Sequence, residues 1–415
     1  MKNKTAQHLI IALFIVPILL FGGAGVKYLL IPYYLYAIFK KDASFLPALV
    51  LLGGVSSNPA PVFLALVLFA IINSRSIVND KSLALPLVLL LLIFPVLTYF
   101  VIAKIQTGTL FNHAIGHYSA YLSLFGFFYG IIIAKSCDED VWKGMVFSLF
   151  ILSLFSTVGV LTIYARLLFA FASIAICLLI FGNKIAYRLF GALGFLIILS
   201  YLDTFTFYLT ILAAIACCYL YKRNKEKFLQ LFSGPVIWIF TIAFFFFAIS
   251  HATEYSMSFS TGNALRDRFT MKLVEDRGML WSSIWIQIVL NNNFLPPVYI
   301  DPIVVIHDDH EIEYAMGQIH EHNIYLHCLR NYGYIIGAIM VYFYVYFTII
   351  ARKAFKIPKM PILFVVLLSS FVANYVIGGA TGNYVTDMSF SLAGMTVLGI
   401  AYNKYKEYES SSLVH

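Results

Sequence analysis

Long apolar runs repeat along the whole chain and alternate with short segments that carry most of its charged residues. A helix that crosses a bilayer needs about 20 mostly apolar residues, or fewer when tilt and interfacial residues help. On this pattern we expect transmembrane helices at residues 8–22, 26–39, 44–56, 60–74, 83–103, 117–134, 143–163, 166–183, 188–202, 204–221, 232–250, 333–351, 360–378 and 386–402. The first four are short and can form two hairpins or tilted helices, so the expected total is about 12–14.

The composition agrees with this pattern and excludes an ordinary soluble domain. Hydrophobic residues occupy 61% of the 415 positions and charged residues only 12%, whereas soluble domains carry about 25% charged residues. We therefore predict an all-α fold, a polytopic membrane helical bundle. The net charge of +8 would suggest nucleic-acid binding in a soluble protein, but here the positive-inside rule explains it, so no nucleic-acid partner is expected.

Lysine and arginine are divided unequally between alternate loops. One set of loops, together with both termini, holds 20 of the 28 residues, which predicts that this set is cytoplasmic. The opposite face holds only eight: Lys27, Lys104, Arg166, Arg266, Arg268, Lys272, Arg277 and Arg330. Basic residues on that face oppose the orientation signal, so these eight need another explanation.

The longest segment outside the expected spans is residues 251–332, on the outer face. It divides the chain into residues 1–250 (the N-terminal part of the bundle), 251–332 (an outer loop with candidate catalytic residues) and 333–415 (C-terminal helices and a short cytoplasmic tail). Within the loop, Met279 to Leu290 predicts a short helix at the membrane surface, and Pro296-Pro297 predicts a break after it.

Several of the outer basic residues can bind phosphate. Arg166 lies at the outer end of an expected span, and Arg266, Arg268 and Arg277 lie in the loop. A guanidinium donates two parallel hydrogen bonds to phosphate oxygens. The structural alternatives are that Arg166 extends to the interface and that the loop arginines pair with nearby carboxylates such as Asp276.

Histidines in the loop suggest two kinds of chemistry. His322 stands directly before an expected span, and an imidazole can exchange protons near neutral pH; the structural alternative is an interfacial capping role. The run His307-Asp-Asp-His310-Glu-Ile-Glu313 is a candidate metal site, but it lacks the His-Glu-x-x-His spacing of zinc proteases. We expect no metal and no cofactor.

Taken together, these elements resemble the O-antigen ligase and polymerase superfamily of bacterial envelopes. The resemblance extends from about Asn112 to Tyr402 and rests on Arg166 at a span end, on Arg277-Gly-Met-Leu-Trp281 and on His322-Asn323-Ile-Tyr325-Leu, followed by Gly333 and Gly337. Tyr164-Ala165 replaces the small polar residues that usually precede the arginine of the first element.

The resemblance implies a metal-independent, inverting glycosyltransferase of the bacterial inner membrane, with a periplasmic active site. The donor would be a glycan on undecaprenyl diphosphate. Arg166 and Arg277 would contact the diphosphate and His322 would activate the acceptor hydroxyl. Arg266 and Arg268 are further phosphate-binding candidates, and Asn323, Tyr325 and Asp387 are supporting residues.

The sequence is compatible with two different acceptors. A ligase uses the lipid A-core oligosaccharide, and a polymerase uses a second lipid-linked repeat unit. The single large loop favours a ligase, while the His-Asn-x-Tyr-Leu element is compatible with both. A flippase for lipid-linked glycans is a third class, but it would be expected to carry more ionisable residues near mid-membrane.

Overall fold

Helices occupy every expected apolar span except residues 232–250, which lie outside the part of the chain that the structure describes. The computed structural model describes residues 3–22, 28–55, 60–107, 118, 120–157, 165–198, 205–223, 280–291, 293–297, 303–307, 310–314, 323–378 and 388–412. The helices are α1 (Lys4–Phe21), α2 (Ile31–Phe39), α3 (Leu46–Val55), α4 (Ala60–Ile72), α5 (Ser74–Val78), α6 (Lys81–Gln106), α8 (Phe125–Ile133), α9 (Glu139–Thr157), α10 (Ala165–Phe181), α11 (Ile185–Ile198), α12 (Phe205–Arg223), α16 (Leu280–Asn291), α17 (Ile324–Ala351), α18 (Ile362–Ala373) and α20 (Met388–Ser412).

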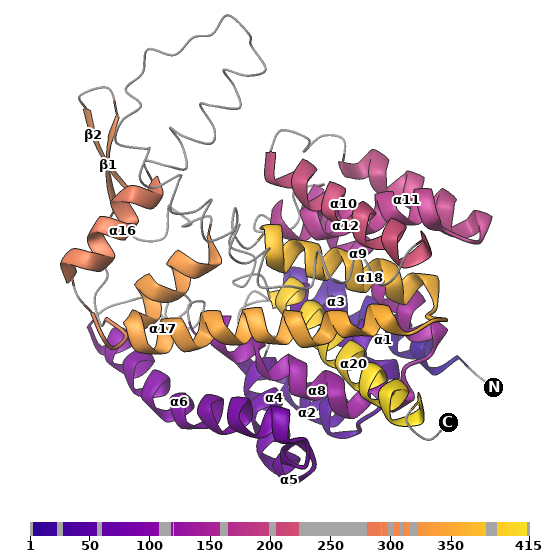
Figure 1. Ribbon diagram of the computed structural model, residues 1–415, viewed down its shortest axis with the longest axis horizontal. Helices are drawn as coiled ribbons and strands as arrows, with labels where there is room; N and C mark the ends of the chain where they lie inside the picture. Colours follow the sequence, from indigo (N-terminus) through magenta and orange to yellow (C-terminus); the bar gives the residue numbers. More distant parts are fainter. Residues whose placement is uncertain are drawn as a thin grey trace, which may run out of the picture.

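The fold is a helical bundle (Figure 1). Among the residues that the structure describes, four segments are long and apolar enough to cross a membrane, namely Lys4–Phe21, Lys81–Gln106, Glu139–Thr157 and Ile324–Lys356, and several further apolar helices have 10–17 residues. Large apolar side chains also face outward: Phe14 of α1 is 77% exposed, and Leu92 of α6 is 63% exposed. A soluble monomer rarely shows such continuous apolar surface, so these helices are suited to contact lipid.

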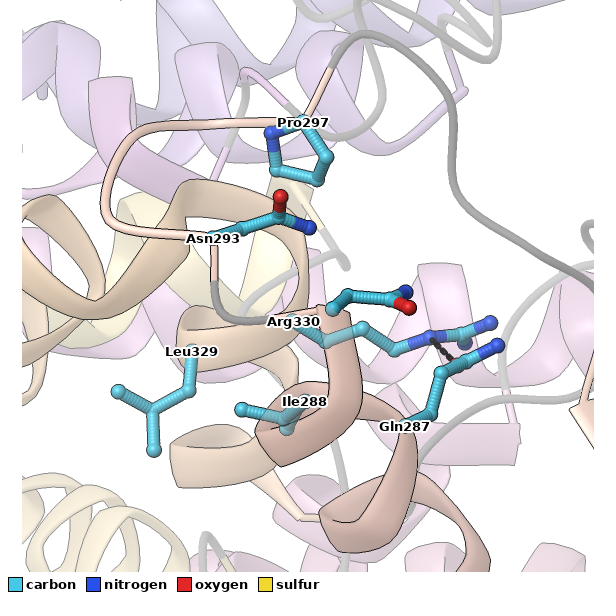
Figure 2. A pocket seen from close by; sticks show the side chains of 7 residues that line it. Gln287, Ile288, Asn293, Pro297, Leu329 and Arg330 are labelled. Atoms are coloured by element: carbon cyan, nitrogen blue, oxygen red, sulfur yellow. Dashed lines mark hydrogen bonds between the residues drawn. The ribbon is translucent and has the colours of Figure 1, made fainter.

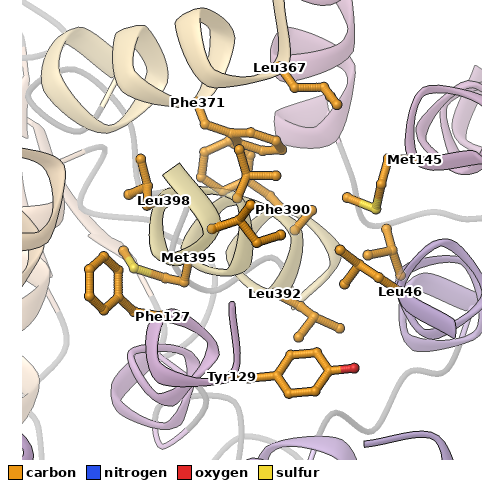
Figure 3. Close-up of a cluster of buried hydrophobic side chains, with 14 of the residues drawn as sticks. Leu46, Phe127, Tyr129, Met145, Leu367, Phe371, Phe390, Leu392, Met395 and Leu398 are labelled. Atoms are coloured by element: carbon orange, nitrogen blue, oxygen red, sulfur yellow. The ribbon is translucent and has the colours of Figure 1, made fainter. Parts of the chain in front are cut away.

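The centre of the bundle is formed by helices that are apolar on all sides. Every residue of α3 is buried, and so is every residue of α18 after Ile362, as expected for helices surrounded by others. In Figure 3, Met395 and Leu398 of α20 lie beside Phe127 of α8, and Phe390 packs against Phe371 of α18. Gly130 and Gly399 bring α8 and α20 together, because a Cβ at either position would overlap the backbone of the other helix.

The loops richest in lysine meet at one face of the bundle, here called the basic face. Lys4 pairs with Asp42, and Lys41 donates a hydrogen bond to Asn73. Further contacts link the remaining loops of this set: Ala43 with Ser136, Glu139 with Lys184, Lys222 with Phe181, Tyr221 with Ile357, Lys353 with Tyr405, and Asp80 with Tyr402. The alternate loops grouped by charge in the sequence therefore share one side of the structure.

A small β-hairpin lies at the other end of the molecule from the two labelled chain ends, next to α16 (Figure 1). Strand β1 (Ile303–His307) pairs antiparallel with β2 (His310–Tyr314), and His307 is opposite His310. From the sequence, only short helices were expected in this segment. Pairing of the Ile-Val-Val-Ile run with the alternating pattern that follows produces the hairpin instead.

Candidate functional site

Helix α17 is interrupted near its beginning by Gly333, which divides it into a short half, residues 324–332, and a long half, residues 334–351. Gly333 has φ 72° and ψ 174°, a backbone conformation open essentially only to glycine. A Cβ at Gly337 would come within 2.6 Å of the carbonyl oxygen of Cys328. In a continuous helix these two positions would be about 13 Å apart along the axis, so the short half folds back along the long half.

The segment after α16 closes the break in α17. Tyr334 N donates to the carbonyl of Asn293 at 2.9 Å, and Ile335 N donates to the carbonyl of Phe294 at 3.2 Å. The first amides of a helix lack partners within the helix, and here the 293–297 segment supplies them. A Cβ at Gly333 would lie 2.5 Å from the backbone carbon and oxygen of Leu295. The predicted break at Pro296-Pro297 is thus confirmed, and the segment has a defined structural role.

Helix α16 packs on the short half of α17, which confirms the short helix predicted from Met279 to Leu290. Trp281, Ile284 and Ile288 form a buried cluster with Leu326, and Tyr334 Oη donates to the carbonyl of Ile288 at 2.7 Å. In Figure 1, α16 and the short half run side by side in the same direction. Both helices therefore direct their N-terminal ends, which carry partial positive charge, to the same side.

Asn323 begins the short half as its N-cap. Its side-chain oxygen accepts hydrogen bonds from Tyr325 N at 2.9 Å and Leu326 N at 3.0 Å, and the residue is fully buried. Asparagine is among the preferred N-cap residues because it satisfies these free amides. The asparagine of the His-Asn element thus has a structural role that fixes where the helix starts after His322. Tyr325 follows in the first turn and packs against the main core.

A small pocket lies between α16, the 293–297 segment and the short half of α17 (Figure 2). It is lined by Gln287, Ile288, Asn291, Asn293, Pro297, Leu329 and Arg330. Arg330 Nε donates to Gln287 Oε1 at 3.1 Å. The pocket therefore combines one guanidinium with three side-chain amides, a set that favours an anionic or strongly polar ligand. Arg330 and Gln287 were not among the site residues predicted from sequence.

A second histidine of the outer segment, His327, has a different environment from that expected of a catalytic base. It is 2% exposed, and Asn331 Nδ2 lies 3.2 Å from its Nδ1 and donates to its backbone carbonyl at 2.9 Å. The ring also packs edge-on against Tyr332. This burial and these contacts within the short half of α17 indicate a structural role for His327.

Most of the residues predicted to carry the chemistry lie outside the described part of the chain. These are His322, Arg277, Arg266, Arg268 and Asp387. Arg166 is the second residue of α10, but its side chain is not part of the description. In sequence, Arg277 precedes α16 by three positions, and His322 directly precedes Asn323. The roles of all six residues stay predictions.

Among the described residues, no three His, Cys, Asp or Glu side chains come together in a way that could hold a metal ion. Of the candidate run His307–Glu313, His307 ends β1 and His310–Glu313 belong to β2, and only the backbone of these residues is described.

Comparisons of this chain with protein-family models, curated proteins and solved structures find no match.

Proposed function

We propose that this protein is a membrane-embedded glycosyltransferase that moves a glycan from undecaprenyl diphosphate to an acceptor hydroxyl, and that it belongs with the O-antigen ligases and polymerases. The observation that carries the proposal is the packing of α16 on the folded-back half of α17. It directs two parallel helix N-termini and the Asn323 cap to one side, while Arg330 and Gln287 line a small pocket toward the C-terminal ends of the same two helices. The side that carries the two N-termini suits an anionic lipid headgroup that arrives from the bilayer.

In this proposal the basic face is cytoplasmic, both termini lie on that side, and residues 251–332 are periplasmic. Support comes from the contacts that join the lysine-rich loops at a single face, such as Lys4 with Asp42 and Glu139 with Lys184. Helix α16 and the hairpin lie away from the chain ends (Figure 1). The positive-inside rule then assigns the lysine-rich side to the cytoplasm of a bacterial inner membrane, with about 12–14 crossings counted from the sequence.

The chemistry proposed for the site is an inverting displacement. The acceptor hydroxyl oxygen attacks the anomeric carbon, the bond from that carbon to the diphosphate oxygen breaks, and His322 takes the hydroxyl proton. Arg166 and Arg277 neutralise the charge on the departing diphosphate, with Arg266 and Arg268 as further contacts. Asp387 holds a positioning role. Charge neutralisation by arginine makes diphosphate a leaving group without a metal ion, so none is included.

For the acceptor, we favour lipid A-core oligosaccharide, as in an O-antigen ligase of lipopolysaccharide biosynthesis. The support is the presence of one large outer segment in the sequence, residues 251–332. A polymerase differs only in using a second lipid-linked repeat unit as the acceptor.

The decisive experiment is transfer in vitro by the purified protein, with defined undecaprenyl-diphosphate-linked donor and the two acceptors offered separately. We expect product with the core acceptor; product only with the repeat-unit acceptor would identify a polymerase. Donor that crosses vesicle membranes without any glycosidic bond would contradict a transferase and support a flippase.

The residue roles are tested in the same assay. His322→Ala should abolish transfer and keep donor binding, because it removes the proton acceptor alone, whereas Arg277→Ala should weaken donor binding. His8→Ala, at the basic face, is the control and should keep full activity. Near-normal turnover of His322→Ala would contradict the general-base role, and inhibition by a chelator that a divalent ion reverses would contradict a metal-free mechanism.

A further inference from the structure

Helix α16 has an apolar face that is exposed, in addition to the face that packs on the short half of α17. Ile286, Val289 and Leu290 all lie on the exposed face, and Leu290 is 76% exposed. The sequence contains no charged residue between Arg277 and Asp301. A continuous apolar surface of this kind is rarely left in contact with water, so the exposed face of α16 needs an occupant.

The apolar surface continues from α16 onto the long half of α17. Phe294 is 59% exposed, and Leu295 beside it is also exposed. The carbonyl of Phe294 accepts the hydrogen bond from Ile335 N, and the Ile335 side chain faces outward from the long half. The long half belongs to a segment that is apolar enough to cross a membrane. Because the surface is continuous, the lipid that covers the long half should cover α16 as well.

The length of the long half sets the depth of this surface in the bilayer. Residues 334–351 rise about 27 Å along the helix axis, which is close to the roughly 30 Å of the hydrocarbon core. They continue into η6 (Arg352–Lys356), whose Lys353 contacts a tyrosine ring of α20 at the basic face. With that end at one interface, Tyr334 lies at the opposite edge of the hydrocarbon core, or inside it if the helix tilts.

Both short helices extend from the level of Tyr334 toward the middle of the bilayer. The short half folds back along the long half, as the close approach of Gly337 to Cys328 shows, and α16 runs beside it in the same direction (Figure 1). The carbonyl of Ile288 accepts a hydrogen bond from Tyr334 Oη, so the earlier turns of α16 lie deeper than this contact. With 12 residues, α16 is too short to cross the membrane.

Backbone groups that close the break in α17 have partners within the protein. The carbonyls of Asn293 and Phe294 accept hydrogen bonds from the long half. The buried Asn323 side chain accepts hydrogen bonds from two amides at the start of the short half. Pro296 and Pro297 have no N–H to satisfy. Irregular backbone is tolerated at membrane depth only when its polar groups are satisfied in this way.

We propose that α16 and the short half of α17 form a re-entrant helix pair in the leaflet away from the basic face, and that the exposed face of α16, together with residues 294–295, contacts lipid acyl chains there. The N-terminal turns of α16 lie deeper than its C-terminal end. A helix lying flat on the membrane surface would instead hold all its exposed residues at one depth. This placement goes beyond the proposed transferase activity and does not depend on it.

The experiment measures fluorescence quenching of a bimane label on the full-length protein in phosphatidylcholine nanodiscs. The test variants are Ile286→Cys and Phe294→Cys. Leu92→Cys, at an exposed position near the middle of α6, is the lipid control, and Lys143→Cys, at a half-exposed position on the basic face, is the aqueous control. All carry Cys137→Ser, because the other four native cysteines are buried. The quenchers are iodide in water and lipids that carry a doxyl group near the headgroup or near the chain end.

We expect doxyl lipids to quench the labels at Ile286 and Phe294, and iodide to quench them several-fold less than the label at Lys143. The ratio of chain-end quenching to headgroup quenching should be higher at Ile286 than at Phe294, because Ile286 lies deeper. This ratio should be highest at Leu92, near the bilayer centre.

Three results would overturn the proposal. Strong iodide quenching at Ile286 and Phe294 without doxyl quenching would place α16 in water. Protection of both labels from both quenchers would mean that protein, such as a second copy of this chain, covers the exposed face. A chain-end to headgroup ratio at Ile286 equal to or below that at Phe294 would mean that α16 lies flat on the surface and is not re-entrant.

Discussion

Substitution of Gly333 by alanine tests the fold-back of α17 directly. With φ 72° and ψ 174°, an alanine at this position costs about 1–3 kcal/mol in backbone strain. Its Cβ would also lie 2.5 Å from the backbone of Leu295, which must move away. That movement breaks the bonds from Tyr334 N to Asn293 and from Ile335 N to Phe294, each worth about 1 kcal/mol.

The expected loss for Gly333→Ala is therefore about 3–5 kcal/mol, a large share of the 5–15 kcal/mol that stabilises a typical domain. The measurement is reversible unfolding in detergent, followed by tryptophan fluorescence, because Trp281 and Trp285 lie in the cluster between α16 and the short half of α17. Donor binding is measured in parallel and should fall with the loss of the fold-back.

Gly126→Ala is the matched control. Gly126 lies inside α8, and its added Cβ would meet the Met395 side chain at 3.3 Å rather than backbone. Alanine is also favoured over glycine in a helix by about 1 kcal/mol, so the two effects largely cancel. If Gly333→Ala unfolded within about 0.5 kcal/mol of Gly126→Ala, a margin typical of neutral substitutions, the left-handed break and the cap built on it would be refuted.

Other variants test the cap, the basic face and the core. Asn323→Ala should lose about 1 kcal/mol of stability, whereas Asn323→Ser should keep most of it; equal losses in chemical denaturation would contradict the capping role. Burial opposes ionisation of Asp80, but hydrogen bonds from Ser82 and Tyr402 outweigh it and hold its pKa below the ordinary value. Its contribution to stability is thus present above the unfolded-state pKa of about 4 and is lost as the pH falls through the folded-state value. Asp80→Asn should therefore flatten the decline of the unfolding midpoint in acid, and an unchanged decline would show that this carboxylate does not contribute. Gly399→Leu should prevent close packing of α20 on α8, because its side chain would overlap the carbonyl of Phe127; a wild-type gel-filtration profile and unfolding midpoint would exclude this packing.

The periodic apolar runs were sufficient to predict the helices, because burial of a wholly apolar helix requires no specific partner. The expected span at residues 333–351 begins at the residue where α17 breaks. The reversal of chain direction at Gly333 could not be predicted from the sequence, because it depends on hydrogen bonds with the 293–297 segment. The β-hairpin was also missed, although the run of β-branched residues Ile303–Ile306 is typical of a strand.

For the site, charge opposing the positive-inside rule was the informative signal. It identified both Lys104 and Arg330 as residues that need a reason, but the burial of Lys104 and the hydrogen bond from Arg330 to Gln287 depend on tertiary packing. Asn323 was predicted to be a supporting residue of the catalytic site. Its observed contacts are those of a helix cap. Short motifs combine structural and chemical requirements, and a sequence alone cannot separate them.

The contact between α8 and α20 has a consequence for biogenesis. About 250 residues separate these two helices in the chain, and translation at 5–20 residues per second needs about 10–50 s to cover them. During that interval the face of α8 around Gly130 has no α20 to cover it. After α8 enters the bilayer, its surface around Gly130 therefore stays uncovered until α20 is synthesised. An insertase or surrounding lipid has to cover that surface in the meantime.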